Sequence, residues 1–143
     1  MHFSAASEEE MTEIGSSIAS TLKPNQIVAL KGGLGAGKTT LAKGVISYLT
    51  GFSPDTVTSP TFQYVQTYQS DECIVFHFDL WRLMTSAEFF ALGLDEFFDQ
   101  GICLIEWPER IDAYLPEDTI FIEISGSQNR RIEIFAGRES AQA

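Results

Sequence analysis

The chain has 143 residues, of which 44% are hydrophobic and 20% are charged, as in an ordinary globular protein. This length predicts one domain covering residues 1–143. No apolar run approaches the roughly 20 residues of a membrane-spanning helix. The first residues also lack the basic and apolar regions of a signal peptide. We therefore expect a cytoplasmic protein with no membrane association.

The formal net charge of −11 is unevenly distributed along the chain. All four lysines precede residue 44, whereas residues 71–123 contain thirteen acidic side chains and only two arginines, Arg82 and Arg110. Such a region repels a nucleic-acid backbone, which is bound through many Lys and Arg contacts. Its acidity suits either a basic partner protein or simple solubility. The negative charge of any polyphosphate ligand must therefore be neutralised by groups at its own binding site, namely loop N–H groups, Lys38 and a metal ion.

The first third of the chain predicts two helices around one buried strand. Met11, Ile14 and Ile18 recur at helical spacing, and Ser7 is a suitable N-cap, so a helix is expected over residues 7–22. Residues 26–31 (QIVALK) form a short apolar run typical of a buried parallel strand. Residues 39–50 predict a second helix that ends at Gly51.

The remaining segments alternate between strand-like and helical patterns. Strands are expected at residues 61–69, 73–78, 102–105, 120–125 and 131–135. Short helices are expected within residues 86–100, with a break near Gly93, and at residues 108–114. Cys73 and Cys103 lie inside apolar runs and are expected to be buried, reduced thiols.

Apolar strands separated by helices predict an α/β fold. We expect a P-loop NTPase-like architecture with a mostly parallel central sheet flanked by helices on both faces. Antiparallel strands are expected in addition, including a C-terminal hairpin that turns at the sequence GSQN.

A phosphate-binding loop is the most specific motif in the chain. Residues 32–39 (GGLGAGKT) match Gly-x4-Gly-Lys-Thr, and they follow a predicted strand and open a predicted helix, as this loop requires. Glycines allow the backbone N–H groups to turn toward phosphate, and the helix N-terminus adds partial positive charge. The loop predicts a nucleoside triphosphate and Mg²⁺ as ligands, and the family resemblance described below narrows the nucleotide to ATP.

Individual roles follow from the chemistry of the loop. The Lys38 ammonium suits the β- and γ-phosphates, the Thr39 hydroxyl suits Mg²⁺, and the Thr40 N–H suits the α-phosphate. Two carboxylates end predicted strands, Asp79 after CIVFHF and Glu106 after ICLI. In a parallel sheet both lie at the ligand-binding edge, where one can hold the metal and the other can orient the attacking water. Their spacing alone does not assign these two roles.

Four motifs together resemble the TsaE family, also known as YjeE, of bacterial P-loop ATPases in tRNA threonylcarbamoyladenosine synthesis. They are the phosphate loop through residue 40, Ser-Pro-Thr-Phe at 59–62, His-x-Asp-x-aromatic-Arg at 77–82 and Ile-Glu-Trp at 105–107. The resemblance covers residues 8–137 and implies a family of ATPases that work with a threonylcarbamoyl-transferase (TsaD) and a scaffold subunit (TsaB). It also implies that tRNA is contacted only through that complex.

The resemblance implies roles for particular residues. Thr39 and Glu106 match the magnesium-binding residues, which favours Glu106 over Asp79 as the metal carboxylate. Asp79 matches a catalytic or water-positioning aspartate. Residues 59–62 match a switch-like segment, in which Thr61 would sense the γ-phosphate. Further positions match the nucleotide-binding loop and an aromatic residue beside the nucleotide: Gly33, Leu34, Gly35, Ala36, Gly37, Lys38, Thr39, Thr40 and Trp107.

Two positions depart from the family pattern, and others have a simpler structural interpretation. Gly33 replaces the usual acidic residue and Trp81 replaces the usual tyrosine. His77 lies inside an apolar strand, where a hydrogen-bonded core histidine is the commoner role. Arg130 and Arg131 could touch the nucleotide or a neighbouring charge, and the surface of the C-terminal hairpin is the commoner position for such residues.

The sequence therefore predicts an ATPase that is weak alone and stimulated by partner proteins, with Asp79, Lys38 and Glu106 as its catalytic residues. A small-molecule kinase on the same loop is an alternative, although few arginines precede residue 130 to form a phosphate-closing lid. A GTPase-type switch is the third possibility, although the chain lacks an Asn-Lys-x-Asp guanine-recognition sequence.

Overall fold

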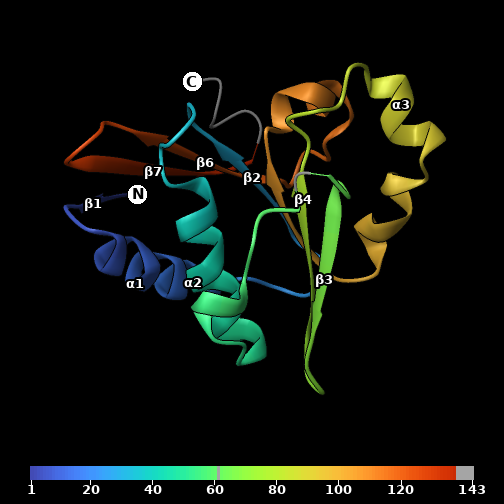
Figure 1. The fold of residues 1–143 in the computed structure, drawn as a ribbon. Coiled ribbons are helices and arrows are strands. Elements are labelled where there is room, and N and C mark those ends of the chain that lie inside the picture. The colour runs from blue at the N-terminus through green and yellow to red at the C-terminus, as the bar shows by residue number, and fades with distance from the viewer. Residues whose placement is uncertain (61, 138–143) are drawn as a thin grey trace.

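The computed structural model describes residues 1–60 and 62–137, which form a seven-stranded mixed sheet with helices on both faces (Figure 1). The strand order across the sheet is β1-β7-β6-β2-β5-β4-β3. The strands are β1 (His2–Ala5), β2 (Ile27–Lys31), β3 (Val65–Gln69), β4 (Ile74–Asp79), β5 (Ile102–Glu106), β6 (Ile120–Ser125) and β7 (Arg130–Ala136).

The centre of the sheet is parallel and its edges are antiparallel. Strand β2 pairs in parallel with β5 and β6, and β5 pairs in parallel with β4. Strand β3 is antiparallel to β4, β7 is antiparallel to β6, and β1 is antiparallel to β7. The predicted α/β class, the parallel centre and the C-terminal hairpin are therefore confirmed.

Three α-helices and three 3₁₀ helices connect the strands within the described residues. They are α1 (Glu8–Ala19), α2 (Lys38–Thr50), α3 (Ser86–Ala91), η1 (Pro54–Thr56), η2 (Leu94–Asp99) and η3 (Pro108–Tyr114). Ser7 caps α1 by accepting a 3.1 Å hydrogen bond from the Glu10 N–H, as its sequence predicts. Gly51 ends α2 and Gly93 separates α3 from η2, both with positive φ.

The structure differs from the sequence prediction in three elements. Strand β1 was not predicted, because its four residues are too few to show the alternation of apolar and polar residues that marks a strand. It forms by pairing with β7. Helix α1 ends at Ala19 rather than near residue 22, and Ser20 forms its C-cap. Strand β3 begins only at Val65, because Tyr64 adopts a left-handed conformation (φ 67°) and its N–H bonds to the Pro60 carbonyl.

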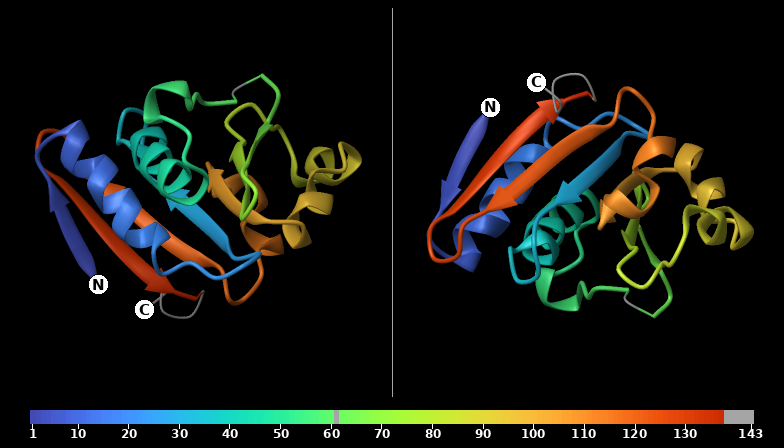
Figure 2. Two further views of the ribbon diagram at one scale, coloured as in Figure 1. Left: turned by 90° about the horizontal axis from the view of Figure 1, so that it is seen from below. Right: turned by 90° about the horizontal axis from the view of Figure 1, so that it is seen from above.

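The sheet separates two hydrophobic cores. Helices α1 and α2 lie side by side on one face, and α3, η2 and η3 cover part of the other (Figure 2). Alternation along β2 divides its residues between them: Val28 and Leu30 face α1 and α2, whereas Ile27 and Ala29 face the opposite core.

Glycines allow α1 and α2 to pack closely. A Cβ atom at Gly44 of α2 would collide with the Thr12 carbonyl of α1, and one at Gly15 of α1 would collide with the Leu41 carbonyl of α2. Backbone atoms on both sides leave no room for a side chain. This contact fixes the position of α2, whose first turn carries Lys38 and Thr39.

Both cysteines are free thiols, with Cys103 buried and Cys73 partly buried. Burial raises the pKa of the Cys103 thiol to about 12 and also raises that of Cys73. Within residues 1–60 and 62–137, none of the helices combines the length and apolar character needed to cross a bilayer.

Candidate functional site

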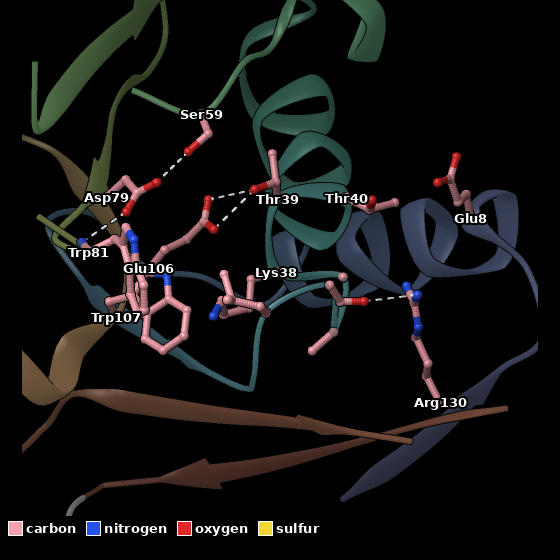
Figure 3. Close-up of a pocket in the computed structure, with 14 residues that line it drawn as sticks. Glu8, Lys38, Thr39, Thr40, Ser59, Asp79, Trp81, Glu106, Trp107 and Arg130 are labelled. Carbon is pink, nitrogen blue, oxygen red and sulfur yellow. Dashed lines mark hydrogen bonds between the residues drawn. The ribbon is translucent and has the colours of Figure 1, made fainter. Parts of the chain in front are cut away.

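A cavity of about 370 Å³ lies where β2, β4 and β5 end and α2 begins (Figure 3). The carboxyl ends of parallel strands are the usual ligand-binding edge of an α/β sheet. The residues that line this cavity are Glu8, Leu34, Gly35, Ala36, Gly37, Lys38, Thr39, Thr40, Ser59, Asp79, Trp81, Glu106, Trp107 and Arg130.

The glycine-rich loop joins β2 to α2, in the predicted order of strand, loop and helix. Gly37 immediately precedes α2 with φ 106°, a conformation that disfavours any side chain. A Cβ atom there would lie 2.6 Å from Arg130 Nη1 and 2.7 Å from Met11 Cε. Within the described residues no side chain hydrogen-bonds to cap this helix terminus, and the first N–H groups of a helix have no partner within the helix itself.

Lys38 is almost fully buried at the base of the loop. Its ammonium donates a 2.6 Å hydrogen bond to the Gly32 carbonyl and lies 3.3 Å from the centre of the Trp107 ring. Burial lowers the pKa of Lys38, and the nearby carboxylates, chiefly Glu106, oppose that shift. Because little water can solvate the buried Lys38 ammonium, its positive charge can interact strongly with an anion.

Thr39 on α2 and Glu106 on β5 are 67 residues apart in the sequence, but their side chains are in contact at the cavity. The Thr39 hydroxyl lies 3.0 Å from each carboxylate oxygen of Glu106. Glu106 Oε2 also lies 2.6 Å from Nε2 of His77, a fully buried side chain on β4. A hydroxyl and a carboxylate together offer the hard oxygen ligands that Mg²⁺ prefers.

Asp79 lies beside Glu106 because β4 and β5 pair them in register. Its Oδ2 accepts a 2.5 Å hydrogen bond from the Ser59 hydroxyl, and its Oδ1 accepts a 3.0 Å bond from the Trp81 N–H. The two strand-end carboxylates therefore occupy one edge of the cavity, as predicted. The segment before β3 contributes Ser59 to this arrangement.

Two indole rings form the wall next to the carboxylates. Trp107 follows β5 in a left-handed conformation (φ 60°), which turns the chain into η3. Its ring centre lies 4.5 Å from that of Trp81, and the Arg110 guanidinium donates to the Trp81 carbonyl at 3.1 Å. Trp107 therefore lines the cavity, and its place beside a nucleotide stays a prediction.

The opposite end of the cavity contains residues that the sequence patterns did not place there. Figure 3 shows Glu8 and Arg130 at the end remote from Asp79 and Trp81. Arg130 Nη2 donates a 3.0 Å hydrogen bond to the Gly35 carbonyl, so Arg130 reaches the loop and the cavity, where a hairpin-surface position was the commoner expectation. No local motif marks Arg130 or Glu8, because the pairing of β7 with β1 brings them to the loop.

Other predicted positions lie outside the cavity. Gly33 does not line it, and a Cβ atom at Gly33 would meet nothing within 4 Å, so the loop has room for a side chain there. Arg131 pairs with Glu133 at 2.9 Å on the exposed face of the hairpin, as expected. Thr61, the predicted γ-phosphate sensor, lies outside the described residues.

Fold and site together define an α/β protein with a glycine-rich loop and two strand-end carboxylates at the carboxyl edge of its parallel strands. Among the described residues, no group of three or more His, Cys, Asp or Glu side chains is placed so that together they could hold a metal ion.

Comparison with known proteins identifies the family. A model of the family described as "Threonylcarbamoyl adenosine biosynthesis protein TsaE" matches residues 5–133. The tRNA threonylcarbamoyladenosine biosynthesis protein TsaE of Bacillus subtilis is 38% identical over 131 residues, covering 90% of this chain and 80% of the relative. Its counterpart in Aquifex aeolicus is 36% identical over 130 residues, covering 90% and 91%.

The fold agrees with a solved structure. The crystal structure of Bacillus subtilis YdiB superposes with a TM-score of 0.74 at 30% sequence identity, covering 99% of this chain and 89% of that one. This chain belongs to the TsaE family, which confirms the resemblance carried by its four sequence motifs.

Proposed function

We propose that this protein is a P-loop ATPase that acts with partner proteins in tRNA threonylcarbamoyladenosine biosynthesis. The observation that carries the proposal is the contact of the Thr39 hydroxyl with Glu106 at 3.0 Å, beside Lys38 and the glycine-rich loop. This combination provides donors for phosphate and oxygen ligands for a metal within one cavity. Family membership supports the biosynthetic role.

The shape of the cavity supports one orientation of ATP. Lys38 and Thr39 would hold the β- and γ-phosphates at the carboxylate end, and the Thr40 N–H would bind the α-phosphate. The nucleoside would then extend toward Glu8 and Arg130 at the opposite end. The loop glycines leave the backbone N–H groups accessible to the phosphates.

The donor set of the site fits Mg²⁺. Thr39 and Glu106 would hold the ion, while Lys38 supplies further positive charge beside it in an acidic protein. When bound, Mg²⁺ neutralises charge that develops on the transferred phosphoryl group. The chain's own contribution is positioning and charge, with no covalent enzyme intermediate.

Asp79 is the residue proposed to orient the attacking water. It lies next to Glu106 across the β4–β5 pair, and Ser59 and the Trp81 N–H hold its two oxygens. These contacts fix the carboxylate at the end of the cavity where the γ-phosphate would lie. Ser59 would also link that position to the switch-like segment at residues 59–62.

Partners are proposed to complete the catalytic site. Arg130, which lines the cavity, already bonds to Gly35, while Arg110 bonds to Trp81 and the Arg82 guanidinium lies over the Phe62 ring. Slow hydrolysis by the isolated chain is therefore expected. A TsaD-type transferase and a TsaB-type scaffold would stimulate it and would provide the contact with tRNA.

The deciding experiment measures ATP turnover by the isolated chain and after mixing with TsaD and TsaB. Co-purification of the three proteins is compared with and without ATP and Mg²⁺. We expect nucleotide-dependent association and a substantial rise in turnover in the complete complex. Equal turnover with and without partners, or no association under any nucleotide condition, would contradict partner dependence.

Two further assays separate the alternatives. GTP competing with ATP at equal affinity would favour a GTPase-type switch. ATP-dependent phosphorylation of a small metabolite by the isolated chain would favour a kinase. We expect neither result, because hydrolysis here is proposed to use water oriented by Asp79 as the acceptor.

A further inference from the structure

His77 occupies a polar position within an otherwise apolar strand. Along β4, Val75, His77 and Asp79 point to the face covered by α2, because alternate residues of a strand share a face. On the neighbouring strand β5, Leu104 and Glu106 point to the same face. The parallel register pairs His77 with Leu104 and Asp79 with Glu106, so His77 and Glu106 are diagonal neighbours.

The hydrogen bond between His77 and Glu106 has a defined direction. His77 Nε2 lies 2.6 Å from Glu106 Oε2, and both side chains are buried. A carboxylate only accepts hydrogen bonds, so the hydrogen must be on Nε2. Nδ1 is buried and has no hydrogen-bond partner among the residues that the structure describes. An N–H at Nδ1 would therefore be an unsatisfied buried donor, which disfavours that tautomer.

We propose that His77 is a positioning residue that holds Glu106 in the orientation required of a magnesium ligand. This inference rests on the proposed function for the role of Glu106, and it assigns to His77 a task beyond filling the core. Hydrogen bonds to ligating side chains orient those ligands, and their removal typically lowers metal affinity about 10- to 100-fold.

The contacts of Glu106 explain why such a support is needed. Its carboxylate oxygens also bond to the hydroxyl of Thr39, which is itself a proposed metal ligand. A Thr39 hydroxyl engaged with a metal has less freedom to direct its hydrogen at Glu106. His77 is not part of the cavity lining, so a bound ligand leaves its contact with Glu106 in place.

The tautomer can be tested on the wild-type chain without nucleotide. The chain has two histidines, His2 and His77, so long-range ¹H–¹⁵N NMR correlations of the imidazole rings can be assigned with a single variant, His77→Gln. We expect a hydrogen on Nε2 of His77. The opposite tautomer, with the hydrogen on Nδ1 and none on Nε2, would overturn the inference.

The positioning role is tested by the Mg²⁺ dependence of nucleotide binding. A fluorescent ATP analogue is titrated with and without Mg²⁺ against wild type, His77→Gln and His77→Leu. Glutamine retains an N–H donor at about the position of Nε2, whereas leucine retains only apolar volume. For His77→Leu we expect the Mg²⁺ concentration at half-maximal binding to rise about tenfold. His77→Gln should restore most of that loss, and affinity without Mg²⁺ should be unchanged.

The outcomes distinguish the positioning role of His77 from the proposed Mg²⁺-dependent function on which it rests. Equal Mg²⁺ dependence in wild type and His77→Leu overturns the positioning role alone. Loss of Mg²⁺-free affinity to the same extent in both variants also overturns it, because that result indicates a general structural role. Wild-type binding that does not depend on Mg²⁺ overturns the proposed function itself. Circular dichroism of each variant verifies folding, and the tautomer itself is measured on the wild-type chain.

Discussion

The two faces of the sheet differ sharply in what they bury. The face covered by α1 and α2 accommodates buried polar or charged side chains, namely Lys38, His77, Asp79 and Glu106. The opposite face packs aromatic rings against each other, with Phe89 lying 6.4 Å from Phe78 and 5.7 Å from Phe98 between ring centres. Burying polar groups is costly unless they are paired, whereas burying rings stabilises the fold directly.

This contrast assigns different tasks to the two faces. The polar residues gather where strands end and α2 begins, and Glu106 contacts both His77 and Thr39 there. The aromatic face provides stability that compensates for their burial. Substitutions on the aromatic face should therefore change folding, whereas substitutions at the polar edge should change ligand binding and turnover in a protein that remains folded.

The largest effect is expected for Phe89→Ala. Phe89 is fully buried, and replacing a buried Phe by Ala typically removes about 3–5 kcal/mol from the free energy of unfolding. Urea denaturation measures this loss. The neighbouring Phe90 is 40% exposed, so Phe90→Ala is a matched control that should cost much less. Weakened ATP affinity of the folded Phe89→Ala protein would contradict the division between faces.

Lys38→Met should decrease ATP affinity or turnover by about 10²- to 10³-fold, because it removes a preorganised positive charge from the phosphate site. Methionine retains much of the apolar stem, so the free energy of unfolding should remain near that of wild type. Calorimetric binding and urea denaturation provide the two measurements. Lys43→Met, on α2 but outside the cavity, is the control. A defect of similar size in both variants would point to helix disruption.

Asp79→Asn is expected to lower turnover about 10²-fold while changing ATP affinity little. The amide can still accept from the Trp81 N–H, so the local geometry is retained while the basic carboxylate is lost. Steady-state kinetics with the complete partner complex separates kcat from KM. Asp95→Asn, on the exposed surface of η2, is the control. A defect confined to affinity would be inconsistent with water positioning.

Gly33→Asp should have the smallest effect. The position has space for a side chain, and its carbonyl lies 3.4 Å from the Lys38 ammonium. A new carboxylate near the phosphates should weaken ATP binding by a few-fold, and added salt should reduce the difference by screening. Gly33→Asn tests sterics without charge and should resemble wild type. Dissociation rates from stopped-flow fluorescence provide the measurement; equal effects of Asp and Asn would indicate a backbone change instead.

Several features of the fold are readable from local patterns. Ser7, Gly51 and Gly93 mark helix boundaries because capping depends on neighbouring backbone groups alone. Strand β1 escapes such patterns because its four residues form a strand only through pairing with β7. The left-handed turn at Tyr64, which delays β3, also has no local glycine to indicate it.

The sequence by itself determined the glycine-rich loop, Lys38 and Thr39, and the two carboxylates as residues that end strands. These follow from contiguous motifs and from the period of apolar residues. Only the tertiary structure brought the Glu106 carboxylate within 3.0 Å of the Thr39 hydroxyl. It also placed His77 in hydrogen-bond contact with Glu106 and Arg130 in hydrogen-bond contact with Gly35 of the loop. Strand register and sheet order decide such contacts, and they are set by packing between segments far apart in the chain.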